Sequence, residues 1–437
     1  MKSKRILEKI GDISEDYIAE ANPIKQRRRT WVKRGALAAC FALAAFIFIK
    51  VIPINLIGPA PEQHDLPILA TEQDDQPLLA TEQDSLPMLA VSEISNEGMG
   101  FEGYMAFDIS EIVNNNPWIE TMEIPTLPVY QNLLSYDENF HVLGADFDKM
   151  RELLLNIASR LDMDVDNLEI TDNTPDEETQ AAITEKFAQT GENVPEGYFS
   201  PTAVMIEDNG IKVEVDQQLT AKISFDPAVT LPDGYNFTHY ATYDQVAAVA
   251  EYLKENYHGL IGMDNPQANI FGGDYSLLFG EDVDTYGAQQ AQSYGIEFYD
   301  ASEDNANQII NYNFNRVAFY NDDDGNLFLA RVFQPDLSEK VGDYPIITID
   351  EAKALLANGN YITSVPVELP GLEYVAKVEL IYRTGGMEQF FMPYYRFYVE
   401  LPDMERDNGL KTFGAYYVPA VEGSYISNMP VWDGSFN

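Results

Sequence analysis

The side chains that perform most enzyme chemistry are scarce in this sequence of 437 residues. Cys40 is the only cysteine, so the chain can form no disulfide within itself and no zinc site built from cysteines. The four histidines stand singly, without a partner at metal-binding spacing: His64, His141, His239 and His258. The motifs Gly-x-Ser-x-Gly and His-Glu-x-x-His and the phosphate loop are also missing. We therefore expect no catalytic residue, no cofactor, no metal ion and no enzyme activity.

Carboxylates are the one reactive type that the chain holds in excess, with 71 Asp and Glu against 27 Lys and Arg and a net charge of −44. Residues 1–50 contain 11 of the basic and 5 of the acidic residues, which leaves 16 and 66 for the rest. That acidic remainder opposes binding to nucleic acid. A pair of carboxylates could cleave glycosidic bonds, so an acidic cell-envelope hydrolase is the alternative to a binding function.

Two acidic turns have the composition of hairpins. Asp208-Asn209-Gly210 separates TAVMIE from IKVEV, and residues 322–326 separate RVAFY from LFLARVF. The second turn also invites a calcium interpretation. An EF-hand loop with Gly325 at its sixth position would place Tyr320 first and Arg331 twelfth, where carboxylates are required. The turn is therefore interpreted as a hairpin and not as a calcium site.

A tyrosine-rich strand is the best candidate for a binding face. It contains Tyr394, Tyr395, Arg396 and Tyr398. Aromatic side chains on a strand usually serve a core, so burial is the competing interpretation. Arg396 and Glu400 fall on the same side of the strand and are expected to pair there.

Three stretches carry helix signals. Apolar residues step by three and four at Phe147, Met150, Leu154, Ile157 and Leu161. Capping boxes that begin at Thr242 and at Thr348 predict a helix over residues 243–257 and a short helix that stops at residues 358–359. Helices mixed with hairpins, rather than alternating with strands, indicate an α+β fold with antiparallel sheets and a few packed helices.

One long apolar segment, residues 35–57, precedes the acidic part of the chain. As a helix it would rise about 34 Å, enough to cross a bilayer. Trp31, Lys33 and Arg34 belong to its basic flank and are expected to anchor the helix at the interface. Positive charge stays inside, so the N-terminus is predicted to be cytoplasmic and the rest extracytoplasmic. The rival interpretation, a lipidated Cys40 after a lipobox-like Leu-Ala-Ala, places the apolar core on the wrong side of the motif.

Residues 61–90 repeat one phrase of ten residues three times: PEQHDLPILA, TEQDDQPLLA and TEQDSLPMLA. The proline in each copy disfavours a helix or a central strand, and ten acidic and polar residues bury too little to stack as a solenoid. We therefore expect residues 58–100 to form a disordered stalk. The alternative is that Leu66-Pro67-Ile68-Leu69 and its copies are a peptide ligand presented three times for avidity.

The N-terminal stretch RILEKIGDISEDYIAEA, a basic cluster and RGALAAC resemble the N-terminus of single-pass membrane proteins from Firmicutes. Some of those proteins resemble anti-sigma factors, in which a cytoplasmic tail holds a sigma factor. The chain lacks the His-x-x-x-Cys-x-x-Cys motif of the zinc-binding class. The competing interpretation is a short helix that orients the membrane anchor.

The C-terminal stretch PIITIDEAKALLANGNYITS, the aromatic strands after it and YYVPA resemble PepSY-like modules of the YycH and YycI accessory proteins. Those proteins regulate a sensor histidine kinase from outside the membrane, so the resemblance implies an α+β module without catalytic residues. The expected organisation is a cytoplasmic tail (1–34), a transmembrane helix (35–57), a stalk (58–100), an extracytoplasmic α+β region (101–343) and a C-terminal module (344–437).

Together these patterns predict a membrane-anchored extracytoplasmic protein that binds or regulates. Its expected partners are the lipid bilayer and either a membrane signalling protein, a sigma factor or a cell-envelope ligand, but not nucleic acid.

Overall fold

The computed structural model describes residues 86–92, 106–109, 112–136, 142–191, 193–194, 197–273, 275–278, 288–291, 294–301, 304–404 and 409–436. All of them belong to one compact unit, residues 82–437. The predicted cytoplasmic tail, the predicted membrane helix and most of the predicted stalk lie outside the described residues. Within the described ranges, no helix combines the length and the apolar character needed to cross a bilayer.

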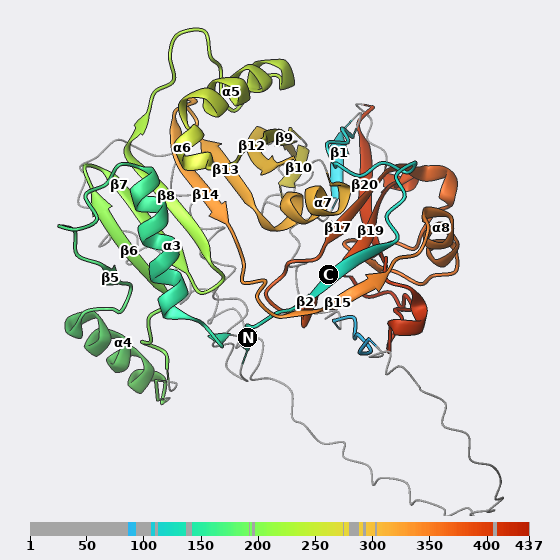
Figure 1. The fold of residues 1–437 in the computed structure, drawn as a ribbon, viewed down its shortest axis with the longest axis horizontal. Coiled ribbons are helices and arrows are strands. Elements are labelled where there is room, and N and C mark those ends of the chain that lie inside the picture. Colours follow the sequence, from blue (N-terminus) through green and yellow to red (C-terminus); the bar gives the residue numbers. More distant parts are fainter. Residues whose placement is uncertain are drawn as a thin grey trace, which may run out of the picture. The chain divides into compact units, whose positions relative to one another are not determined.

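An antiparallel sheet of eight strands occupies the middle of the chain (Figure 1). Its order is β5-β6-β7-β8-β14-β13-β12-β9. The strands are β5 Thr171–Asp172, β6 Ala203–Asp208, β7 Ile211–Asp216, β8 Thr220–Val229, β9 Pro266–Gly272, β12 Tyr294–Asp300, β13 Arg316–Asn321 and β14 Leu327–Phe333. Both predicted hairpins, β6-β7 and β13-β14, are confirmed.

The turns of these hairpins have local causes. Asn209 and Gly210 have φ values of 48° and 81°, as a two-residue hairpin turn with a left-handed backbone requires. A Cβ on Gly210 would lie 2.1 Å from the Asp226 carbonyl oxygen, so only glycine fits. In the other turn, the Asp322 carboxylate accepts hydrogen bonds from the backbone N–H groups of Asp324 and Asn326. That carboxylate is therefore engaged in holding the turn.

Helices cover one face of this sheet. They are α3 Phe147–Arg160, α5 Tyr243–Asn256 and α6 His258–Ile261, while α4 Glu177–Thr190 buries no residue. The predicted helices that became α3 and α5 are confirmed. Helix α3 buries Met150, Leu154 and Ile157, and the Thr242 capping box opens α5. Their apolar stripes pack against alternate residues of the sheet to form one core.

A second antiparallel sheet contains β1 Ala106–Ile109, β20 Lys411–Pro419, β19 Pro393–Glu400 and β17 Val375–Tyr382 in this order, with β16 Ile362–Thr363 also paired to β20. A sheet of three strands lies in the order β15 Lys340–Pro345, β2 Thr126–Gln131 and β18 Phe390–Phe391. The remaining strands form two short pairs, β3 Ser135–Tyr136 with β4 Val142–Leu143 and β10 Tyr275–Leu278 with β11 Ala288–Ala291. Short 3₁₀ turns are η3 Leu372–Tyr374, η4 Pro402–Met404 and η5 Gly423–Tyr425.

Each face of the β17-β19-β20 sheet carries its own core. One core includes the predicted short helix, which is confirmed as α8 Ile349–Ala357 with its Thr348 capping box. Helix α7 Asn305–Phe314, which was not predicted, joins the same core through Ile309 and Phe314. Because α7 connects β12 to β13, it ties the eight-stranded sheet to β17, and the Asn313 side chain accepts a hydrogen bond from the Tyr382 N–H at 2.9 Å.

Two features differ from the predicted organisation. The expected boundary between residues 343 and 344 falls inside β15, which pairs with β2, so the C-terminal sheets include strands from the preceding region. The prediction of a disordered stalk is wrong for residues 86–92. The Leu89 side chain is fully buried, and the backbone of Leu89 forms a parallel β-bridge with Ile426. Proline removes only its own N–H donor, so the neighbouring backbone groups remain able to pair.

Candidate functional site

A cavity of about 1210 Å³ is lined by residues of both larger sheets. One side comes from β9, β12, β13 and β14, and the other from β17 and β19, with α7 contributing between them. The volume is of the size that holds a small molecule or a short oligomer. It is therefore the best candidate for a functional site among the described residues.

Strand alternation explains which side chains reach the cavity. In β13, Val317 and Phe319 enter the helix-covered core, while Arg316, Ala318 and Tyr320 line the cavity. Strands β12 and β14 alternate in the same way, with Glu297 of β12 toward the cavity between Ile296 and Phe298 in the core, whereas β9 lines the cavity with consecutive residues from Asn269 to Gly272. The same apolar pattern that builds the core therefore delivers polar side chains to the opposite face.

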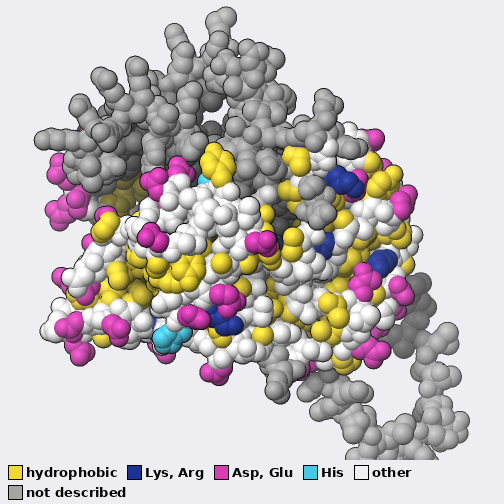
Figure 2. All heavy atoms as spheres, turned by 90° about the horizontal axis from the view of Figure 1, so that it is seen from above, with side chains coloured by type: hydrophobic (Ala, Val, Ile, Leu, Met, Phe, Trp, Pro, Cys, Tyr) yellow, Lys and Arg dark blue, Asp and Glu magenta, His cyan; other side chains and the backbone are white. Residues whose placement is uncertain are grey.

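The cavity is more basic than the rest of the acidic chain. Its lining includes four cations, Arg316, Arg331, Lys377 and Arg396, and two carboxylates, Glu297 and Glu379. Only 16 Lys and Arg residues follow residue 50, so a quarter of them gather here. Acidic side chains instead spread over the face of the molecule in Figure 2, where Lys and Arg are isolated. The cavity is thus a local reversal of the charge of the surface.

Glu379 is the buried centre of a charged cluster. The Lys377 ammonium lies 2.8 Å from one carboxylate oxygen, and the Arg396 Nε donates to the other at 2.7 Å. The Glu379 side chain is 3% exposed. Burial raises the pKa of Glu379, but the charges of Arg396 and Lys377 outweigh it and hold this pKa below its usual value. Burial lowers the pKa of Lys377 against the opposing effect of Glu379.

The opposite wall of the cavity holds a second ion pair, between Arg316 and Glu297, and a further cation, Arg331. Arg316 lies 3.2 Å from Glu297 and stacks over the Phe333 ring. The guanidinium of Arg331 lies over the Tyr320 ring at 5.5 Å, and no carboxylate of the described residues forms an ion pair with it. Arg331 also hydrogen-bonds the Tyr320 side chain, and its charge opposes the rise that burial causes in the pKa of Asp216, so it is engaged by its neighbours without a direct ion pair.

Tyr312 of α7 lies within the electrostatic reach of both pairs. Burial raises the pKa of Tyr312 far above its usual value, and the carboxylates of Glu379 and Glu297 raise it further while Arg396 and Arg316 lower it. The phenol therefore keeps its proton at all physiological pH values and can act as a neutral hydrogen-bond donor to a ligand.

The predicted tyrosine face is divided by the strand. Arg396 and Tyr398 line the cavity, whereas Tyr395 points into the opposite core and donates its hydroxyl hydrogen bond to the Ile347 carbonyl. Tyr394 and Tyr398 are both buried in the core that also contains Leu89, so Tyr398 belongs to that core as well as to the cavity lining. The expected pairing of Arg396 with Glu400 is wrong, because Arg396 pairs with Glu379 across the strands and Lys411 takes Glu400 at 2.7 Å.

The sequence interpretation missed most of the cavity. It did not single out Arg316, Lys377, Glu297 or Tyr312, and it treated Arg331 only as a failed calcium ligand. A signal was present in the sequence, since basic residues are rare after residue 50 and several interrupt apolar strands such as RVAFY, LFLARVF and VAKVELIYR. A charge inside such a strand must face away from the core and toward something polar.

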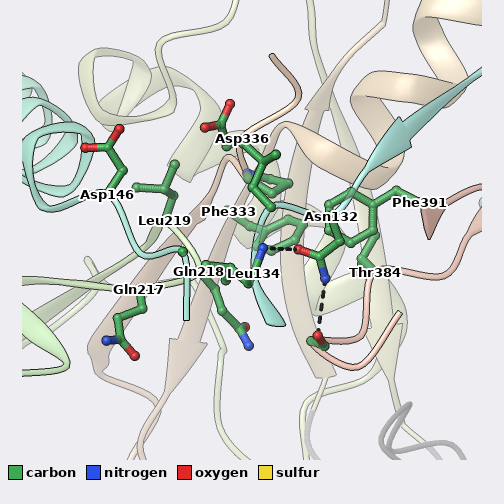
Figure 3. A pocket seen from close by; sticks show the side chains of 14 residues that line it. Asn132, Leu134, Asp146, Gln217, Gln218, Leu219, Phe333, Asp336, Thr384 and Phe391 are labelled. Carbon is green, nitrogen blue, oxygen red and sulfur yellow. Dashed lines mark hydrogen bonds between the residues drawn. The ribbon is translucent and has the colours of Figure 1, made fainter. Parts of the chain in front are cut away.

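A second pocket lies beside the cavity and is far smaller, about 40 Å³. Figure 3 shows Asn132 at its centre, where the side chain accepts from the Leu134 N–H and donates to the Gly386 carbonyl. This space is close to the volume of one water molecule. It is a small, mainly apolar gap in the packing just after β2 and is too small to hold a substrate. In the described part of the chain, no three His, Cys, Asp or Glu side chains gather where they could hold a metal ion.

The predicted membrane-anchoring residues Trp31, Lys33 and Arg34 lie outside the described residues. No protein-family model matches the sequence, and no curated protein matches it. Among solved structures, the chain is similar to an uncharacterized protein from Eubacterium rectale at 11% identity. That similarity has a TM-score of 0.29 and covers 71% of this chain and 91% of the other.

Proposed function

We propose that the chain is a membrane-anchored binding protein whose folded part, outside the cytoplasm, holds an anionic ligand in the cavity between its two larger sheets. The observation that carries this proposal is the concentration of four of the sixteen later cations in one cavity of an otherwise acidic chain. Scattered cations would serve solubility, whereas cations that converge on one space favour a ligand of opposite charge.

The arrangement of the cations favours carboxylate or phosphate groups on the ligand. Glu379 neutralises much of the charge of Lys377 and Arg396, and Glu297 does the same for Arg316. Arg331 forms no direct ion pair among the described residues, and its planar guanidinium beside Tyr320 is the anchor for an anionic group in this proposal. Tyrosine hydroxyls and the Asn115 and Asn269 side chains on the lining add neutral hydrogen-bonding groups. A short anionic fragment of the cell envelope fits this chemistry.

The N-terminal part of the chain places the cavity outside the membrane in this proposal and suggests how binding is reported. Residues 35–57 form the anchor in this proposal, with Trp31, Lys33 and Arg34 at the cytoplasmic interface. Ligand binding would then be reported to a membrane signalling protein or, through the cytoplasmic tail, to a sigma factor. The resemblances of the two ends of the chain to anti-sigma-like proteins and to PepSY-like accessory regulators support this role.

The hydrolase alternative receives less support from the cavity. A glycosidase needs one carboxyl group that retains its proton near neutral pH. Glu379 has the opposite property, because Arg396 and Lys377 hold its pKa below the usual value. Its carboxylate is also engaged by both cations, so it is poorly placed to act as a nucleophile.

Titration of the full-length protein in detergent solution tests the proposal. The probes are citrate, inorganic pyrophosphate, triglutamate and galacturonic acid oligomers, followed by isothermal calorimetry. We expect saturable binding of at least one, weakened about tenfold or more by Arg331→Gln because a charged hydrogen bond contributes at least about 1.5 kcal/mol. The matched control is Arg151→Gln, which removes an exposed cation of α3 away from the cavity. Equal affinities in the two variants, or no binding of any anion, would contradict the proposal.

A further inference from the structure

The third copy of the repeat is seated on the folded unit through residues 86–92. The N–H of Leu89 donates to the Tyr425 carbonyl and its carbonyl accepts from the Ser427 N–H, both at 2.8 Å. The Asn428 side chain bonds both backbone groups of Val91, at 2.7 and 2.8 Å. This repeat-docking site, formed mainly by residues 425–428, thus holds the segment by backbone pairing at one parallel bridge, Leu89 with Ile426, and by the Asn428 side chain.

These hydrogen bonds do not depend on the side chains of the docked segment. The Tyr344 hydroxyl donates to the Pro87 carbonyl at 2.8 Å, and the Ser427 hydroxyl donates to the Leu89 carbonyl at 2.8 Å. Only the Ser92 hydroxyl contributes a side-chain bond, to the backbone of Met387 and Gln389. Any segment that places its backbone in the same way would make the other bonds.

The side chains that contact the docking site have counterparts in the two earlier copies of the repeat. Leu89 is fully buried, and Leu69 and Leu79 take its place in the first and second copies. Proline and alanine at the flanking positions are identical in all three. Met88 is 54% exposed, which explains why isoleucine and leucine replace it freely.

The position of Leu86 distinguishes how well the first and second copies fit the docking site. Its side chain fills the space beside Gly342, where a Cβ would lie 2.5 Å from the Leu86 Cδ2. The first copy keeps leucine at this position, Leu66, whereas the second has Gln76. A glutamine there would bury its amide against an apolar surface. The first copy therefore matches the site better than the second.

We propose that the repeat-docking site is a receptor for the repeat itself, and that residues 66–70 exchange with residues 86–90 of the same chain. The exchange moves the point at which the chain enters the folded unit by twenty residues. Tethering favours a segment of the same chain over one from a second copy, since the local concentration of a tethered segment is in the millimolar range.

The third copy holds the advantage for identifiable reasons. Val91 is 4% exposed, and the first copy would place the hydroxyl of Thr71 there. Ser92 would be replaced by Glu72. Docking of the first copy also lengthens the connection to β1 from about 13 to about 33 residues, which alone disfavours it only about fourfold. The two registers are thus close enough for one to replace the other when the third copy is weakened.

Hydrogen exchange on the full-length protein tests the exchange of registers. In the unmodified chain we expect slow exchange at the amides of Leu89 and Ser427 and fast exchange at Leu69. In Leu89→Asp, the Ser427 amide should stay protected and the Leu69 amide should slow at least tenfold. In the double variant Leu69→Asp/Leu89→Asp both should exchange fast, whereas Leu79→Asp/Leu89→Asp should behave like Leu89→Asp alone.

A milder variant avoids placing a charge in the core. Val91→Thr/Ser92→Glu makes the third copy resemble the first, so about a fifth of the molecules should dock the first copy, and the Leu89 amide should keep only about fivefold protection. Loss of Ser427 protection in Leu89→Asp to the level of the double variant, or full protection of Leu89 in the milder variant with none at Leu69, would overturn the proposal. Protection at Leu69 that rises with protein concentration would also overturn it, because the docked segment would then come from a second copy.

Discussion

Replacing Glu379 with glutamine probes the charged cluster in the lining of the cavity. The substitution keeps the shape of the side chain and removes its charge, so Lys377 and Arg396 remain together in a site where the Lys377 side chain is 8% exposed and that of Arg396 is 16% exposed. Removing one partner of a buried ion pair costs about 3 to 5 kcal/mol. We take the lower end, about 3 kcal/mol, because the glutamine oxygen still accepts a hydrogen bond.

The expected readout is a lower Tm. For a folded unit of this size, 1 kcal/mol corresponds to about 2 °C, so Glu379→Gln should lower the Tm by about 6 °C at pH 7 in a thermal scan. The matched control is Glu120→Gln, which breaks the exposed ion pair with Lys353 and should cost at most about 2 °C. A loss no larger than that of the control would refute the assignment of Glu379 as a buried, stabilising charge.

The stability that Glu379 contributes should also depend on pH in a defined direction. The folded-state pKa of Glu379 lies below its usual value of 4.5, so its stabilising contribution is complete above that value and disappears as the pH falls through the folded-state pKa. The difference in Tm between the unmodified chain and Glu379→Gln should therefore be constant from pH 6 to 8 and shrink as the pH falls below about 4. A difference that grows in acid would contradict the reasoning.

Three further predictions follow from exposure, docking and backbone geometry. The side chain of Val431 is 71% exposed, so a Val431→Cys variant without the native cysteine should react with a membrane-impermeant maleimide on intact cells. Reaction that occurs only after lysis would contradict the proposed topology. Deleting residues 71–80 should leave the Tm within about 1 °C, since the third copy stays seated, and a fall of several degrees would show a role for the second copy. Gly210→Ala should lower the Tm by about 4 °C or more because of the 2.1 Å approach to Asp226, whereas Asn209→Gly should be nearly neutral; similar effects would contradict the turn geometry.

Local signals explain which parts of the fold could be predicted. A capping box and an Asn-Gly turn act over two to four residues, so α5, α8 and the β6-β7 hairpin were visible in the sequence. Helix α4 buries no residue and so leaves no apolar stripe to detect. Helix α7 places the polar Asn313 among its buried positions, which breaks the periodicity of its apolar face.

Long-range pairing explains the rest. Strand β2 pairs with β15 more than two hundred residues later, and no local pattern specifies that partner. The cavity draws Glu297, Arg331 and Lys377 from three strands, and their convergence depends on how two sheets are joined through α7. Sequence reasoning found Arg396 and Tyr398 because they share one strand, and it could not place the residues opposite them.

The docking of residues 86–92 determines where mechanical force enters the folded unit. Tension applied to the chain on the N-terminal side of Leu86 would first load the hydrogen bonds of Pro87 and Leu89, before it reached β1 of the sheet. Rupture of those bonds would release residues 86–92 themselves, which add about 25 Å of contour length at most. The seated segment would therefore yield before the sheets do, and the cavity would keep its shape while the chain was pulled.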